Sequence, residues 1–207
     1  MPYHPEEHHR RSIRLKSYDY SLPGAYFITI CTQNHTCMFG EVLQGEMRLN
    51  DPGRMVEKWW HELKHKFPTI RAGEFVLMPN HFHGIIYILN ADQGAHVGAD
   101  LRVGPLGNTG TQPQEDAHEG DRGTHAGAPL PEIVQWFKTM TTNEYIRGVK
   151  GLGWLPFPEK LWQRNYYEHI ARDDTDLARI QKYISNNPQE WELDLLYPGN
   201  LIKQTRS

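Results

Sequence analysis

The chain has few cysteines and no long apolar run. Cys31 and Cys37 are its only cysteines among 207 residues, so at most one disulfide can form. No stretch approaches the length of a membrane span, and the first residues, MPYHPEEHHRR, contain no apolar segment like that of a signal peptide. Because secretory signals are absent, we expect two reduced thiols in a cytoplasmic protein with no membrane association.

The chain also has little net charge, −3 at pH 7, which by itself does not indicate a nucleic-acid-binding protein. The charge is unevenly distributed, however. The segment 90–128 contains six acidic residues against two arginines, a net charge of −4, and the remainder holds 20 basic and 19 acidic residues. The remainder is therefore mildly basic, with basic clusters at 10–16 and 160–172, and this composition permits a polyanionic partner.

The same segment, 90–128, has no aromatic residue and carries eight of the 18 glycines. It cannot bury enough apolar surface to offset the entropy lost on ordering it. We therefore expect one globular domain over residues 1–207, interrupted by a flexible insertion at 90–128. The rest of the chain has enough apolar residues for a substantial core.

Outside the insertion, apolar periodicity, capping residues and turn residues predict an alternation of strands and helices. The predicted strands are 25–32, a hairpin within 38–49 that turns at Gln44-Gly45, 75–78, 84–89 and 162–171. The predicted helices begin at Asn50-Asp51-Pro52, span 129–147, and run from Asp173 to about Asn187. This order predicts an α+β sandwich in a ferredoxin-like arrangement, a mainly antiparallel sheet with helices on one face.

Two histidines stand at the break between two predicted strands, in EFVLMPNHFHGIIYIL. If the second strand begins at His81, the side chains of His81 and His83 emerge on one face, about 7 Å apart at the backbone, and Phe82 anchors the other face. Such a pair can hold a divalent metal ion at an open strand end. The alternative is a turn with two partly exposed histidines.

A second group lies on the last predicted helix, where Tyr183 and Asn187 are four residues apart and share one face. In one interpretation Tyr183 packs against the sheet and Asn187 caps the helix before Pro188. In the other, Tyr183 is a covalent nucleophile beside a metal site, since a metal bound to a scissile phosphate stabilises the developing charge.

Three motifs, MPNHFHGII, WQRNYYEHIAR and YISNNP, occur in this order. Together they resemble the HUH single-tyrosine transposases, and specifically the REP-associated tyrosine transposases of the insertion-sequence-200-like branch. The resemblance implies that His81 and His83 are metal ligands and that Tyr183 is the nucleophile. Asn187 matches the position of a polar third ligand, commonly glutamine; because asparagine is shorter, direct ligation, contact through water and helix capping all stay open.

The resemblance also implies the chemistry. The family cuts single-stranded DNA beside a hairpin through attack of the tyrosine on phosphorus, which leaves a 5′-phosphotyrosine and a free 3′-hydroxyl that later rejoins strands. The implied cofactor is Mg²⁺ or Mn²⁺, although imidazole also suits zinc. The implied partner is single-stranded DNA from hairpin-forming repeats or element ends, bound by a monomer or by a homodimer that exchanges the tyrosine helix.

Further residues are candidates for DNA contacts, either with phosphates or with bases. They are Arg14, Lys16, Trp162, Gln163, Arg164, Tyr166, His169 and Arg172. Tyr166 and Tyr167 are rival nucleophiles that face opposite sides of a strand, so at most one of them reaches the site. Packing and ordinary solvated surface are the alternatives for all of these residues, and a structural role is the alternative for His169.

Three other functions remain open. The chain could bind hairpin or repeat DNA without cleaving it, as a silent or domesticated protein. It could hydrolyse small phosphoesters with a structural Tyr183, although further acidic metal ligands are not apparent. It could also be a replication-initiator nuclease with HUH chemistry, although the Tyr-x₃-Asn ending fits the transposase branch better.

Overall fold

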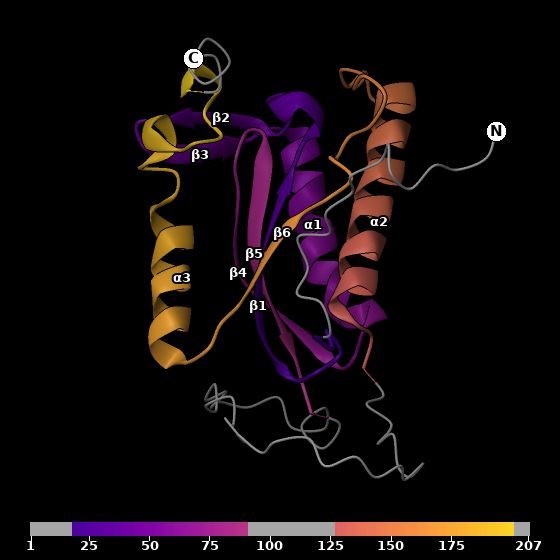
Figure 1. Cartoon of the computed structure of the whole chain (residues 1–207). Helices are drawn as coiled ribbons and strands as arrows, with labels where there is room; N and C mark the ends of the chain where they lie inside the picture. The colour runs from indigo at the N-terminus through magenta and orange to yellow at the C-terminus, as the bar shows by residue number, and fades with distance from the viewer. Residues whose placement is uncertain (1–17, 91–126, 201–207) are drawn as a thin grey trace, which may run out of the picture.

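The computed structural model describes residues 18–90 and 127–200 (Figure 1). Its centre is a four-stranded antiparallel sheet in the order β4-β5-β1-β6. The strands are β1 (Gly24–Cys31), β4 (Ile70–Leu77), β5 (His81–Ile88) and β6 (Tyr167–Ile170). The α+β class and the antiparallel sheet are confirmed, and β5 begins at His81, as the metal-site hypothesis requires.

A separate two-stranded hairpin, β2 (Gly40–Leu43) and β3 (Glu46–Leu49), follows the first strand. Its turn residues, Gln44 and Gly45, have φ angles of 54° and 77°. Two positive φ angles at the centre of a two-residue loop match the twist of the flanking strands, which confirms the predicted turn.

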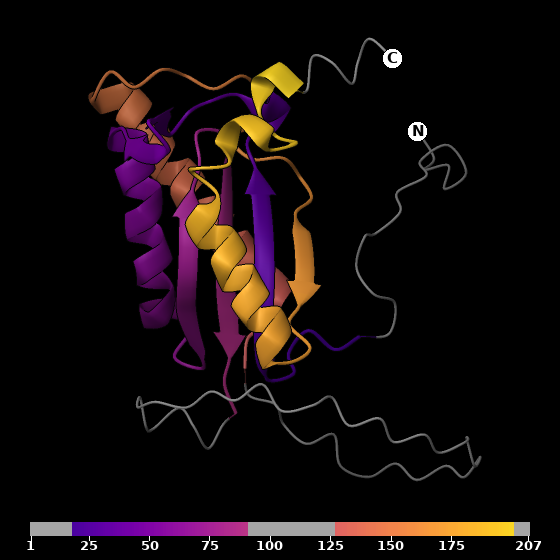
Figure 2. The same cartoon turned by 90° about the vertical axis from the view of Figure 1, so that its left-hand side faces the viewer.

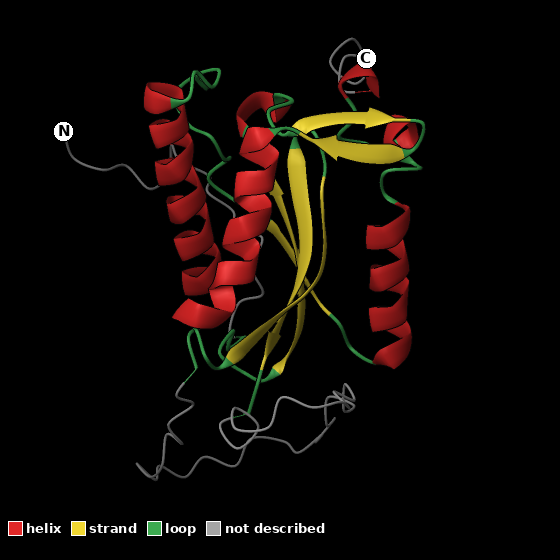
Figure 3. Cartoon of the chain, turned by 180° about the vertical axis from the view of Figure 1, so that it is seen from behind, coloured by secondary structure: helices red, strands yellow, loops and turns green. Residues whose placement is uncertain are grey.

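Helices α1 (Asp51–Lys66) and α2 (Leu130–Gly151) lie side by side on one face of the sheet (Figures 1 and 3). Asn50 caps α1 by accepting a hydrogen bond from the Gly53 backbone, and Pro52 occupies the first turn, as predicted. The side chain of Trp60 on α1 is fully buried against the sheet. Gly84 of β5 makes room for it, since a Cβ at this position would lie 2.8 Å from the Trp60 ring.

Helix α3 (Asp174–Asn186) lies on the opposite face of the sheet (Figure 2). Asp173 caps it, and its predicted apolar seam, Leu177, Ile180 and Ile184, is buried against the sheet. The prediction that the helices share one face is therefore wrong. The physical reason is that β1 and β5 are buried at nearly every position, so both faces of the sheet need a cover.

Strand β6 is shorter than the predicted strand 162–171. The residues before it continue along the sheet edge through an isolated bridge between Thr32 and Trp162. The predicted insertion falls almost wholly at 91–126, and the basic arm that carries Arg14 and Lys16 falls within 1–17; both lie outside the described residues. No helix in the described ranges is long and apolar enough to cross a membrane.

Candidate active site

Strand β5 brings His81 and His83 to the face of the sheet that α3 covers. The two rings lie 4.5 Å apart between centroids, and both side chains are buried, with 0% and 2% of their surface exposed. Phe82 points to the other face, where it packs against Trp60 and Phe137. The alternation of a strand therefore separates the two imidazoles from the aromatic ring that anchors them.

Each imidazole is held at its Nδ1 atom by a neighbouring side chain. Asn80 Oδ1 lies 2.8 Å from Nδ1 of His81, and Thr29 Oγ1 lies 2.8 Å from Nδ1 of His83. The orientation of the Asn80 amide is fixed because its nitrogen donates to the backbone oxygens of His35 and Leu196. Asn80 Oδ1 can therefore only accept, so His81 carries its proton on Nδ1 and its Nε2 has a free lone pair.

Burial decides the charge of both imidazoles. It lowers the pKa of His81 to about 4, partly opposed by the negative charge of Asp194 and by the nearby amide side chain of Asn187. Burial, and then the neighbouring His81, holds the pKa of His83 well below its ordinary value. Both rings are therefore neutral at pH 7, which is the form in which histidine binds a metal.

Asp194 lies beside the two histidines and belongs to the segment that follows the 3-10 helix η3 (Trp191–Leu193). One ligand atom from each of His81, His83 and Asp194 lies within 4.8 Å of the others, and the Asp194 carboxylate is 3.8 Å from His81 Nε2. The backbone N–H of Leu196 donates to the other carboxylate oxygen at 2.7 Å and fixes its position. This group could bind a metal ion, because two imidazoles and a carboxylate form a common ligand set.

Asp194 is a candidate site residue that the sequence does not predict. It lies in an irregular segment beyond the last regular helix, and neither strand nor helix periodicity places it beside β5. In the sequence, Asp194 is distinguished only as an acidic residue a short distance after the helix that carries Tyr183. Such a residue is too common on protein surfaces to be singled out.

Asn187, the predicted third ligand, lies at the C-terminal cap of α3 and is 3% exposed. Its amide nitrogen donates to Asp194 at 3.4 Å. Within the described residues its Oδ1 atom and the Nε2 atom of His81 are both buried without a hydrogen-bond partner. Buried polar atoms without partners are costly, so these two point to a ligand that they would hold. The available donors, two imidazole nitrogens, a carboxylate and an amide oxygen, fit a divalent cation.

Tyr183 meets this group from α3. Its hydroxyl lies 3.3 Å from Nε2 of His83, and its ring packs edge-on against His83 and Phe27. The residue is 43% exposed, so Tyr183 lies at the border with solvent and not within the apolar interior. Burial and the negative charge of Asp194 raise the pKa of Tyr183, and the hydroxyl therefore keeps its proton at neutral pH.

The two adjacent tyrosines are divided between the faces of the sheet. Tyr166 is 9% exposed and belongs to the core beneath α1 and α2, so its ring is not free to stack on a base. Tyr167 is 54% exposed and pairs with Thr29, in the same row of the sheet as His83. Of the two, it is Tyr167 that shares a face with the candidate site.

The other proposed DNA contacts lie in different environments. Trp162 is buried against Phe39 and donates to Thr141, which removes its ring from any exposed base-reading surface. His169 contacts Asp176 at 2.7 Å, in accord with its structural interpretation. Gln163, Arg164 and Arg172 retain solvent-accessible side chains.

No family model matches the chain. Two solved structures share parts of its fold. One is a REP-associated tyrosine transposase bound to a REP hairpin, with 16% identity, a TM-score of 0.49, and coverage of 86% of this chain and 74% of that chain. The other is a candidate transposase from Deinococcus radiodurans, with 14% identity, a TM-score of 0.39, and coverage of 84% and 97%. At these scores neither likeness identifies the chemistry of this chain.

A stronger relationship joins the chain to a protein of Haemophilus influenzae that is described as uncharacterised. The two sequences are 40% identical over 191 residues, which cover 92% of this chain and 94% of that protein. The chain therefore belongs to the same protein family as this Haemophilus influenzae protein.

Proposed function

We propose that the chain is a transposase-like strand-transferase of the HUH single-tyrosine class, which cuts and rejoins single-stranded DNA next to a hairpin. The observation that carries the proposal is the 3.3 Å separation between the Tyr183 hydroxyl and His83 Nε2, beside the group formed by His81, His83 and Asp194. A nucleophile and a metal-binding group at one solvent-bordering point are what phosphoryl transfer by tyrosine needs. The order of the three sequence motifs supports the same class.

In the proposed reaction the Tyr183 oxygen forms a bond to phosphorus, and the bond between phosphorus and the 3′-oxygen of the preceding nucleotide breaks. The products are a 5′-phosphotyrosine on Tyr183 and a 3′-hydroxyl. Because Tyr183 borders solvent, water takes the phenolic proton and supplies the proton of the leaving oxygen. The bond energy is kept in the phosphotyrosine, so the same steps in reverse rejoin strands without a nucleotide cofactor.

His81, His83 and Asp194 would hold the divalent ion, which we propose to be Mg²⁺ or Mn²⁺, and Asn187 would add its amide oxygen. The bound ion supplies Lewis-acid polarisation of the scissile phosphate and offsets the negative charge of Asp194. Asn80 and Thr29 keep the two Nε2 atoms directed at one point. All of these groups come from one chain, so we propose that a monomer suffices.

The test is the formation of a covalent adduct. A labelled pool of hairpin oligonucleotides with a randomised single-stranded flank is incubated with the protein and Mn²⁺ and then separated on a denaturing gel. We expect an adduct with the wild type and none with Tyr183→Phe or His81→Ala. Tyr167→Phe is the matched control, since it changes the exposed tyrosine of the same face and should keep the adduct. An undiminished adduct with Tyr183→Phe would refute the proposal.

A second candidate is metal-dependent hydrolysis of phosphodiesters with no covalent step. Asp194 favours it, since a carboxylate added to the two histidines completes a ligand set that could activate water. Turnover of a small phosphodiester that survives Tyr183→Phe and is lost in Asp194→Asn would establish this alternative.

A further inference from the structure

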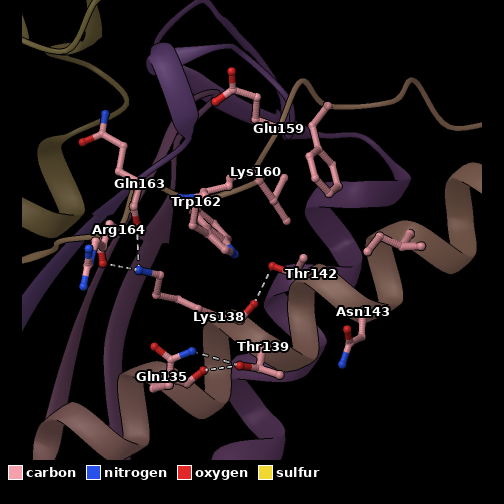
Figure 4. Close-up of a pocket in the computed structure, with 13 residues that line it drawn as sticks. Gln135, Lys138, Thr139, Thr142, Asn143, Glu159, Lys160, Trp162, Gln163 and Arg164 are labelled. Carbon is pink, nitrogen blue, oxygen red and sulfur yellow. Dashed lines mark hydrogen bonds between the residues drawn. The ribbon is translucent and has the colours of Figure 1, made fainter. Parts of the chain in front are cut away.

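A pocket of about 490 Å³ lies between helix α2 and residues 157–164, apart from the candidate active site (Figure 4). Its α2 side consists of residues that recur three and four positions apart, so one stripe of the helix faces the pocket. These residues are Gln135, Lys138, Thr139, Thr142, Asn143 and Ile146. All but the last are polar, which is unusual for a helix face that turns toward another segment of the chain.

Lys138 is the central cation of this pocket. Its ammonium group donates to the backbone oxygens of Gln163 at 2.7 Å and Arg164 at 2.9 Å (Figure 4). An ammonium group has three N–H donors, so one remains for a further partner. Within the described residues Lys138 forms no ion pair with a carboxylate, and burial lowers its pKa to about 8. The pocket therefore holds a partly buried positive charge that neutral groups alone support.

The opposite side of the pocket adds more positive charge than negative charge. Lys160 and Arg164 are exposed there, and Glu159 is the one acidic residue among those that line the pocket. Three cationic side chains and a single carboxylate thus line the pocket, together with the apolar side chains of Ile146, Phe157 and Leu161. This composition favours an anionic ligand over an apolar one.

The pocket and the candidate active site lie near the same end of the sheet, the pocket on the side of α2 and the candidate site on the face that α3 covers. In the register of β1 and β5, Cys31 pairs with His81, and the Cys31 backbone oxygen accepts the N–H of Gln163. Gln163 therefore lies about two strand spacings, roughly 10 Å, from His81 at the backbone. Its side-chain nitrogen also lies 3.0 Å from Nε2 of His35, whose backbone oxygen accepts from Asn80.

We propose that this pocket binds the phosphodiester backbone of the DNA strand beside the cleavage position, with Lys138, Lys160 and Arg164 as the phosphate contacts. The inference rests on the proposed function, because it takes DNA as the substrate. The contacts carry no base specificity, since ammonium and guanidinium groups that bind phosphate oxygens fix the position of a strand without reading its bases. The pocket would therefore position the strand, while other residues select its sequence.

The test measures binding of a fluorescent hairpin oligonucleotide by anisotropy, in a chelator that prevents cleavage, over a range of salt concentrations. Each phosphate contact that is lost should lower the slope of log K against log salt by about 0.7–0.9. We expect Lys138→Gln and Arg164→Gln each to show this lower slope and to bind about three- to tenfold more weakly near physiological salt. Lys150→Gln is the matched control, an exposed lysine of the same helix that does not line the pocket.

Lys138→Gln removes two hydrogen bonds to backbone oxygens and could therefore disturb the fold. Arg164→Gln is the second variant, because the exposed Arg164 side chain can be replaced without disturbing the fold. Wild-type affinity and slope in folded Arg164→Gln and Lys138→Gln would overturn the proposal. The proposal would also be overturned if millimolar inorganic phosphate competed as well as the oligonucleotide does. The pocket would then be a small-anion site. Since no cleavage is required, a wild type that gives no covalent adduct but keeps these binding differences would refute strand transfer and leave the pocket assignment standing.

Discussion

The two faces of the central sheet are formed by the same strands but carry different kinds of side chain. On the face covered by α1 and α2, β1 and β5 contribute apolar side chains such as Ile28 and Phe82, which are fully buried in a large aromatic core. On the face covered by α3 the same strands contribute Thr29, His81 and His83, which are buried but polar. Alternate residues of one strand therefore build the core and the candidate site separately, so each can be disturbed with limited effect on the other.

The largest expected effect concerns stability. Phe82→Ala should lower the free energy of unfolding by about 3–5 kcal/mol, because it leaves a cavity among Trp60, Phe75 and Phe137. Phe27→Ala on the other face should cost less, about 1–3 kcal/mol, because its surroundings border solvent. Urea unfolding followed by circular dichroism measures both values. Equal losses would contradict the division between the faces.

The next effect concerns metal binding. Asp194→Asn removes the one carboxylate of the His81, His83 and Asp194 group, and we expect at least a tenfold loss in Mn²⁺ affinity by calorimetry. Glu192→Gln, an exposed change two residues earlier, is the control and should bind Mn²⁺ as the wild type does. An unchanged affinity in Asp194→Asn would exclude Asp194 as a ligand.

Asn80→Ala should disturb both stability and the site. It removes the partner of His81 Nδ1, and loss of a residue that orients a ligand typically lowers metal affinity about 10- to 100-fold. It also leaves the backbone oxygens of His35 and Leu196 without their donor, at a cost of about 1–3 kcal/mol. Thr29→Val, which removes only the partner of His83, should weaken Mn²⁺ binding with a smaller change in unfolding. A variant Asn80→Ala with wild-type Mn²⁺ affinity would show that the tautomer of His81 is fixed by other means.

The smallest effect concerns the attachment of α3. Burial raises the pKa of Asp176, but hydrogen bonds from Arg179 and His169 outweigh burial and lower the pKa to about 2. Because this folded-state pKa is below the unfolded value of 3.8, Asp176 stabilises the fold above about pH 4, and the contribution is lost as the pH falls toward 2. The difference in melting temperature between the wild type and Asp176→Asn should therefore shrink between pH 4 and pH 2. A difference that is constant across this range would contradict the assignment.

Much of the fold could be predicted because its signals are local. The capping residues Asn50 and Asp173 predicted where α1 and α3 begin, and the turn residues Gln44-Gly45 predicted the hairpin. The side of the sheet on which α3 packs was not predictable in the same way. Central strands that are buried on both faces leave that choice to the connections between elements.

The candidate site was predictable only in part, for the same reason. Strand alternation placed His81 and His83 together, and helical spacing placed Tyr183 near Asn187. Asp194 and Asn80 act through contacts between distant or irregular segments, for which sequence periodicity carries no information. To predict that Tyr167 is exposed and Tyr166 is buried, one must know how β6 pairs with β1, and the sequence does not determine this register.

The proposed reaction is attack by Tyr183 on a DNA phosphorus held beside the His81–His83 pair. It is tested most directly by digesting the protein–oligonucleotide adduct with a protease and locating the attached nucleotide by mass spectrometry. We predict that the nucleotide is found on the peptide that contains Tyr183, linked through a 5′-phosphate. A nucleotide attached to Tyr167, or to any residue other than Tyr183, would contradict the claim.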